Sequence, residues 1–220
     1  MELLKSKACV KQAVFRKTKE TFEILAEQVE HLALSIDKEI SSIDTNVHLN
    51  AERKGDYETR LYFSGDLLLF HMHTNAFGFD QNHGIKKLTY VKEDPSRAYC
   101  GIINIYNFLA DSFRFNRVND LGLLVARIFV NKDGHFYVEG PKHIGVLFNN
   151  FSKQEVSKEA MNKVVTTAMD YSMKEDLLTP PFQYVKEVQV HQMQSLSSEL
   201  RVRTAKKLGF KMQGDSEIKG

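Results

Sequence analysis

The sequence predicts an α+β protein in which an antiparallel β-sheet of about four to seven strands is covered by a long N-terminal amphipathic helix and by C-terminal helices. Two observations support this fold class. Apolar residues follow a helical period at the start of the chain and again after residue 150, and segments rich in aromatic and β-branched residues cluster between them. Strands that follow one another, instead of alternating with helices, favour antiparallel pairing with helices on one face.

The domain organisation follows from the same pattern. The 220 residues can bury a sizeable core, and no linker divides them. We expect a single domain in which residues 1–50 form the long helix, a possible dimerisation element. Residues 51–150 form the antiparallel sheet core, residues 151–211 a C-terminal helical segment, and residues 212–220 a flexible tail.

The N-terminal part has the clearest periodic pattern, because its apolar residues recur at steps of three and four as one helical face requires. They are Phe22, Leu25, Val29, Leu32, Ile36, Ile40, Ile43 and Val47. A helix from about residue 7 to about residue 49 would be ~64 Å long, more than the diameter of a compact domain of this size. We therefore weigh two arrangements. The helix lies across its own sheet, with a kink near Ser41 and Ser42, or it pairs with a second copy in a homodimer.

Two β-hairpins are predicted in the sheet core. Residues 57–74 contain two strands around the turn Ser64-Gly65-Asp66. Residues 123–140 contain two more, around a turn in which Gly134 supplies a positive φ.

The segment between the hairpins is less regular. Residues 86–95 read as a short strand ended by Pro95. Residues 98–117 fit either a buried strand followed by a turn near residues 110–112, or a helix. We favour the strand because β-branched and aromatic residues are enriched in its first half.

Helical spacing returns in the C-terminal segment. Ser152 and Glu155 fit a capping box at the start of a helix. The apolar residues on one face of this helix, at four-residue spacing, are Val156, Ala160, Val164 and Ala168. Residues 182–192 fit an edge strand or a helix, and residues 198–209 a terminal helix.

Charge, cysteine content and motifs exclude several classes of protein. Thirty Lys and Arg against 28 Asp and Glu leave a net charge of +2, so no global field favours nucleic acid or a membrane. Two cysteines are too few for a disulfide framework, and no stretch has the length of a signal peptide or a membrane span, so we expect a cytoplasmic protein. Phosphate-binding loops and nucleophile elbows are absent, so no cofactor is predicted other than a divalent metal.

Residues 70–84 hold the densest set of candidate metal ligands. His71 and His73 lie on one face if this segment is a strand, because side chains alternate. Asp80 and His83 return after a turn at Gly78, so nitrogen and oxygen ligands for a divalent metal could converge. The alternative is that these histidines occupy an ordinary sheet and turn.

Two further sets of residues are candidate binding groups. An anion- or ligand-binding set consists of Arg97, Arg114, Arg117 and Arg127, which either bind a planar anion or pair with nearby carboxylates. A nucleic-acid-binding set consists of Arg201, Arg203, Lys206 and Lys207, together with the N-terminal Lys5, Lys7, Lys11, Arg16, Lys17 and Lys19.

These observations favour a ligand- or partner-binding module over an enzyme, acting as a homo-oligomer or binding a partner protein through the long helix. One alternative is a divalent-metal-dependent hydrolase that uses His71, His73, Asp80 and His83. The other is a nucleic-acid-binding protein that uses the basic segments at both ends.

Overall fold

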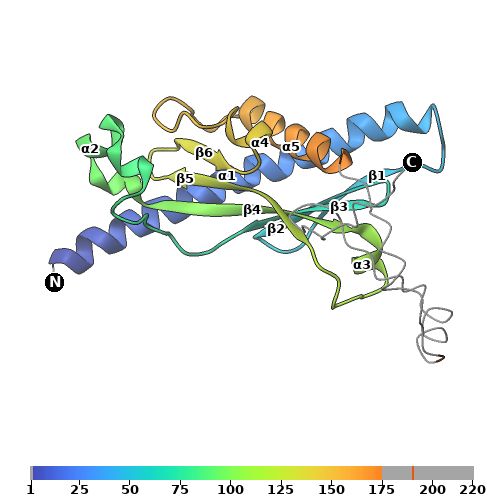
Figure 1. Ribbon diagram of the computed structural model, residues 1–220, viewed down its shortest axis with the longest axis horizontal. Helices are drawn as coiled ribbons and strands as arrows, with labels where there is room; N and C mark the ends of the chain where they lie inside the picture. The colour runs from blue at the N-terminus through green and yellow to red at the C-terminus, as the bar shows by residue number, and fades with distance from the viewer. Residues whose placement is uncertain (1, 175–189, 191–220) are drawn as a thin grey trace, which may run out of the picture.

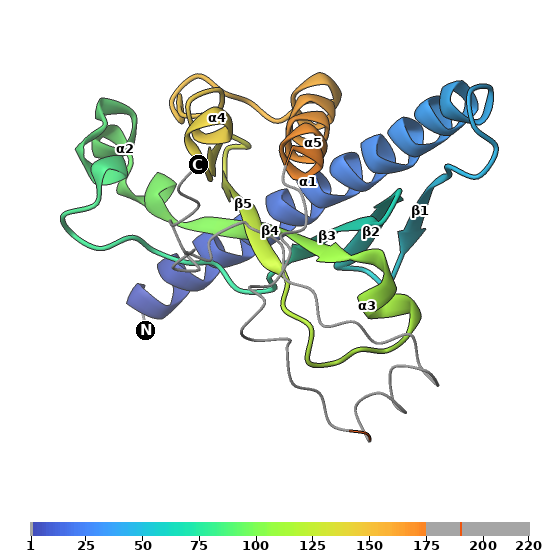
Figure 2. The same ribbon diagram turned by 45° about the vertical axis from the view of Figure 1, so that its right-hand side comes forward.

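The computed structural model describes residues 2–174 and residue 190, and it confirms the α+β class. Helix α1 (Glu2–Ser41) crosses one face of a six-stranded antiparallel sheet, and helix α5 (Lys158–Met173) packs beside it on the same face (Figures 1 and 2). The strands are β1 (Leu49–Arg53), β2 (Glu58–Phe63), β3 (Asp66–Met72), β4 (Cys100–Leu109), β5 (Leu123–Asn131) and β6 (Phe136–Glu139). Each strand pairs with the next one in the chain, so their order in the sheet is also β1 to β6.

The structure confirms both predicted hairpins. Strands β2 and β3 pair from Phe63 and Asp66 outward, around the predicted turn. Strands β5 and β6 pair around a turn in which Gly134 has a φ of +83°. The irregular segment is also a strand, β4, as we favoured, and its expected turn is the one-turn helix α3 (Ala110–Arg114).

The stripe of α1 is buried by the chain's own sheet, which confirms the first of the two arrangements that we weighed. The core between them contains Phe22, Leu25, Val29 and Ala33 of α1 with Leu68, Phe70, Ile103, Ile105 and Ile128 of the sheet. Helix α5 adds Met161, Val164, Val165 and Ala168 to this core. The stripe on which the homodimer prediction depended is therefore used within one chain.

Helix α1 ends at Ser41 and not near residue 49, so this part of the prediction is wrong. The predicted kink is the end of the helix, where the Ser42 hydroxyl donates to the carbonyl of Glu39 at 2.6 Å. The Asp37 carboxylate then accepts the backbone N–H of Leu49 at 2.9 Å, which brings the chain back to start β1. Ile43 keeps the helical spacing in the sequence, yet its side chain is 85% exposed in the connecting loop.

A lobe of short helices joins β3 to β4 and corrects the strand predicted over residues 86–95. It contains η1 (Gly84–Lys87), α2 (Thr89–Glu93) and η2 (Pro95–Ala98). Pro95 begins η2 instead of ending a strand, because the Asp94 carboxylate accepts the Ser96 N–H at 2.9 Å and caps the turn. The lobe covers one end of the second face of the sheet, where Ile85 and Val91 pack in a cluster with Ile102, Phe129 and Phe151.

The segment after β6 explains why the predicted capping box is wrong. The N–H groups of Phe136 and Val138 donate to the carbonyls of Gln154 and Phe148, so this segment covers the free edge of β6. Ser152 therefore lies outside any helix, after α4 (Lys142–Gly145) and before α5. The residue that caps α5 is Ser157, whose hydroxyl oxygen accepts the Ala160 N–H at 3.1 Å.

The predicted edge strand over residues 182–192 and the terminal helix over residues 198–209 lie almost wholly outside the described residues. Among the helices that are described, none is both long enough and apolar enough to cross a lipid bilayer.

Candidate binding surfaces

The four predicted metal ligands do not form a cluster. His71 lies in β3 opposite Asn104, and His73 follows the strand, where its Nδ1 accepts the Asn75 N–H at 3.0 Å. In residues 2–174, no group of three or more His, Cys, Asp or Glu side chains is arranged to hold a metal ion. The hydrolase alternative therefore has no preformed ligand set in this part of the chain.

The turn that carries the other two predicted ligands is held together locally. The carbonyl of Asp80 accepts the backbone N–H of His83 at 3.0 Å. The Nδ1 of His83 accepts the Ile85 N–H at 3.3 Å and so caps η1, while the His83 ring stacks on Phe79 with the ring centroids 4.5 Å apart. These contacts give His83 a structural role in starting the lobe.

The four predicted anion-binding arginines lie on different elements, and three of them have acidic partners. Arg97 of η2 binds Asp133, and Arg127 of β5 binds Glu139 of β6. Arg117 forms a buried ion pair with Asp120, with 2.9 Å between Nε and Oδ2. Arg114 is exposed, and its guanidinium lies 5.4 Å from the ring centroid of Phe115. Within the described residues, the structure does not bring the four together as one anion site.

The C-terminal members of the nucleic-acid set, Arg201, Arg203, Lys206 and Lys207, lie outside the described residues. Lys5, Lys7 and Lys11 lie on the first turns of α1, which project beyond the sheet (Figures 1 and 2), whereas Arg16, Lys17 and Lys19 lie where α1 packs on the sheet. Lys17 pairs with Glu20 at 2.7 Å and Lys19 with Asp56 at 3.7 Å. Lys7, Lys11 and Arg16 are exposed, and no ion pair joins them to a carboxylate of residues 2–174.

The lobe adds a second set of basic side chains at the same end of the molecule. Lys87 and Lys92 are exposed and Lys86 is half-buried, and none of the three has an ion-pair partner in the described part of the chain. We call these two sets together the basic end and define it by Lys7, Lys11, Arg16, Lys86, Lys87 and Lys92; α1 lies on one face of the sheet and the lobe on the other. Sequence reasoning missed the lysines of the lobe because it assigned them to a strand.

The lobe is fixed to the rest of the fold beside α1. The Arg97 guanidinium lies 4.2 Å from the ring centroid of Tyr90 and binds Asp133 of the β5–β6 turn at 2.9 Å. Burial alone would raise the pKa of Asp133, but hydrogen bonds from Lys132 and Arg97 hold it below the ordinary value. The stem of Lys17 packs against Gly134 of the same turn, so α1 and the lobe are positioned by one hairpin end.

Three acidic side chains elsewhere on α1 have basic partners within the chain. Arg53 binds both Glu30, at 2.5 Å, and Glu23, at 2.7 Å, and Lys158 binds Glu27 at 3.2 Å.

The comparisons with known proteins give no relative. No protein-family model, no curated protein and no solved structure matches this chain.

Proposed function

We propose that this protein is a noncatalytic interaction module whose basic end binds an acidic protein partner. One observation carries the proposal. Two elements far apart in the sequence, the start of α1 and the lobe, each present an exposed leucine beside lysines without acidic partners in the described residues. Leu4 is 67% exposed near Lys7, and Leu88 is 37% exposed beside Lys87.

The combination of charge and apolar surface supports a protein partner. Burying an exposed leucine side chain stabilises a complex by about 1.5–3 kcal/mol at most. Unpaired lysines attract acidic surfaces and raise the rate of association. A nucleic acid would use the lysines but not the leucines, and the aromatic residue among the basic residues of α1, Phe15, is half-buried beside Tyr57 and not free to stack on a base.

Fluorescence anisotropy with synthetic probes tests the proposal. The probes are a labelled helical peptide of Leu and Glu, the same peptide with Gln in place of Glu, and a labelled DNA duplex of random sequence. We expect the Leu/Glu peptide to bind best, and its affinity to fall as salt is added, because the charges are exposed. Stronger binding of the duplex would instead support the nucleic-acid alternative and overturn this proposal.

Matched charge-reversal variants locate the surface. The test variant carries Lys7→Glu, Lys11→Glu, Lys87→Glu and Lys92→Glu. The control carries the same change at Lys38, Lys142, Lys153 and Lys174, which are exposed on other parts of the fold. We expect the test variant to bind the Leu/Glu peptide at least about tenfold more weakly, which is about 1.4 kcal/mol. Equal weakening by both variants would show that binding follows net charge and not the basic end.

A further inference from the structure

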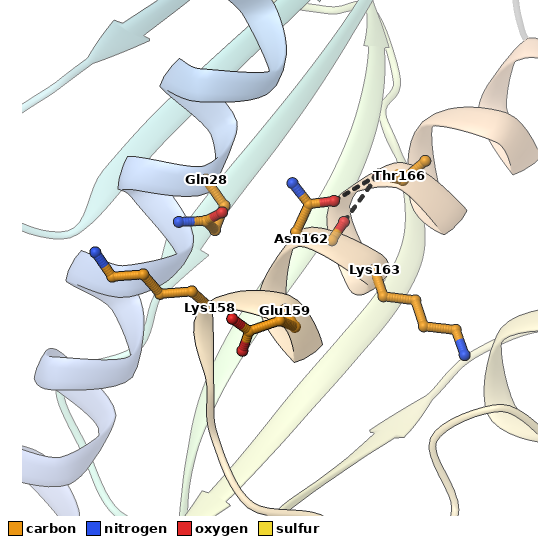
Figure 3. A pocket seen from close by; sticks show the side chains of 6 residues that line it. All are labelled: Gln28, Lys158, Glu159, Asn162, Lys163 and Thr166. Carbon is orange, nitrogen blue, oxygen red and sulfur yellow. Dashed lines mark hydrogen bonds between the residues drawn. The ribbon is translucent and has the colours of Figure 1, made fainter.

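A polar groove lies between α1 and α5, on the half of α1 that is distant from the basic end. Its volume is about 450 Å³, and Figure 3 shows the six side chains that line it. They are Gln28 of α1 and Lys158, Glu159, Asn162, Lys163 and Thr166 of α5. The groove is shallow and open to solvent, so a ligand would lie along its floor and would not be enclosed.

Gln28 is the residue that makes this groove a candidate binding site. Its side chain is only 9% exposed, and its carboxamide has no hydrogen bond to any residue that the structure describes. The amide atoms of Gln28 are not among the fully buried side-chain atoms that lack a partner, so they are accessible from the groove. An amide that lines a groove and has no hydrogen bond within the described residues is available to bind a ligand.

Asn162 and Thr166 of α5 line the groove together with Gln28 of α1. The Thr166 hydroxyl donates to the carbonyl of Asn162 at 2.9 Å and lies 3.3 Å from its side-chain oxygen. Figure 3 shows the amide nitrogen of Asn162 turned away from Thr166 and toward α1. The groove therefore presents two carboxamides, one from each helix, as hydrogen-bonding groups.

Opposite charges lie beside these amides. The pKa of Glu159 is below its ordinary value because its own backbone N–H and the Ser157 hydroxyl stabilise the carboxylate, so it is ionised at neutral pH. Lys158 supplies an ammonium group, which also binds Glu27 at 3.2 Å. Lys163 is turned outward, with its Nζ 5.9 Å from the ring centroid of Phe148.

We propose that this groove binds the main chain of a short peptide or free amino acid. Gln28 and Asn162 form hydrogen bonds to the amide or carboxylate groups of the ligand, Glu159 binds its ammonium group, and Lys158 binds its carboxylate. Carboxamides suit this task because each carries both a donor and an acceptor, as a peptide group does. This binding is separate from the basic end and does not depend on the function proposed for it.

Nuclear magnetic resonance tests the site directly, because side-chain amide protons of Gln and Asn are observed in the same spectrum as the backbone. Full-length protein is titrated with triglycine, with N-acetylated and amidated triglycine, and with glucose. We expect triglycine to shift the side-chain amide signals of Gln28 and Asn162 in a saturable manner, and the capped peptide to bind at least several-fold more weakly. No saturable shift with triglycine, or equal shifts with glucose or with the capped peptide, overturns the proposal.

Two variants complete the test. Gln28→Leu is expected to abolish the triglycine shift at Asn162 while leaving the thermal midpoint of unfolding nearly unchanged, because the Gln28 amide makes no hydrogen bond within the described residues. Gln12→Leu, at an exposed position on the same helix, is expected to leave the shift intact. A shift at Asn162 that persists in Gln28→Leu, or a fall in the thermal midpoint of that variant, contradicts the role assigned to Gln28.

Discussion

The distance between α1 and the sheet is set at one residue, Gly101 of β4. A Cβ atom at this position would lie 2.0 Å from the Thr18 hydroxyl oxygen and 2.8 Å from the Thr18 Cβ, so only glycine allows the observed approach. Thr18 is fully buried there, and its hydroxyl donates to the carbonyl of Val14 at 2.7 Å. The contact anchors the helix just beyond the point where its N-terminal turns leave the sheet.

We predict that Gly101→Ala lowers the free energy of unfolding by about 1–3 kcal/mol, because α1 must shift to make room. Denaturant unfolding measures the change. Thr18→Ala in the same chain should restore part of the loss, since it removes the nearest atoms. Gly65→Ala is the control, because no atom lies within 4 Å of a Cβ built there. An equal loss in both single variants would contradict the packing described for α1.

A second prediction at this scale concerns the acid side of the pH dependence of stability. Hydrogen bonds from Ser96 and Lys132 lower the pKa of Asp94 to about 2, from an ordinary value of 3.8. Since the folded pKa is the lower one, the stabilisation is complete above pH 3.8 and is lost as the pH falls toward 2.

Asp94→Asn should therefore reduce the loss in the free energy of unfolding between pH 3.8 and pH 2. The reduction should be less than about 1 kcal/mol, because the carboxylate is partly exposed. Urea unfolding at a series of pH values measures it. Asp170→Asn, at an exposed position, should leave the curve as in the unmodified protein. An unchanged curve for Asp94→Asn would mean that the cap of η2 does not hold the charge as described.

At the scale of elements, the sequence offers two serines, Ser152 and Ser157, as caps for α5, and the structure shows which of them is used. Both are followed by a Glu within three residues, but only Ser157 accepts an N–H of the helix, from Ala160. The Ser152 hydroxyl donates instead to Asn150 at 3.1 Å, within the segment that covers β6.

We predict that Ser157→Ala lowers the free energy of unfolding by about 1 kcal/mol, as loss of a helix cap does. Ser152→Ala should change it by less than about 0.5 kcal/mol, because its bond is exposed. Thermal or denaturant unfolding of the two variants compares them. A larger loss for Ser152→Ala than for Ser157→Ala would support the capping box that the sequence predicts at Ser152 and contradict the cap at Ser157.

The elements that the sequence predicts correctly are those whose local pattern and tertiary environment agree. Alternation and Gly134 are sufficient to predict the β5–β6 hairpin, and the apolar residues from Phe22 to Val29 are sufficient to predict α1 and its buried face. The lobe was mispredicted because each of its three short helices buries a single residue, which is too few to show a helical period. Ile43 was misassigned because its spacing continues a helix that Ser42 and Asp37 end through hydrogen bonds.

Binding surfaces were harder to predict, because convergence in space has no local signal. The histidines of residues 70–84 are close in sequence, yet His73 and His83 each bind a backbone N–H two residues further along the chain. The basic end joins two segments separated by about seventy residues, and the groove at Gln28 joins two helices more than a hundred residues apart. The first half of the basic end was visible as a run of lysines, whereas Gln28 offers no signal until its burial is known.

At the scale of the whole molecule, the projecting turns of α1 should be dispensable for folding. Described side chains before Val10 are exposed, and Val14 is the first that is fully buried. We predict that deletion of residues 2–11 lowers the free energy of unfolding by less than about 1 kcal/mol while weakening binding of the Leu/Glu peptide. Circular dichroism melting and anisotropy measure the two effects. A chain that fails to fold would show that these turns belong to the core.

The two cysteines provide the most direct measurement of whether α1 lies on its own sheet with a free N-terminal end. Cys9 is exposed on the projecting turns, whereas Cys100 is buried in β4, where burial raises the pKa of its thiol. Native protein is treated with a maleimide, and the labelled residue is identified by mass spectrometry over a range of protein concentrations. We predict rapid labelling of Cys9 at every concentration and labelling of Cys100 only after unfolding. Protection of Cys9 that grows with protein concentration, or rapid labelling of Cys100, would contradict this arrangement.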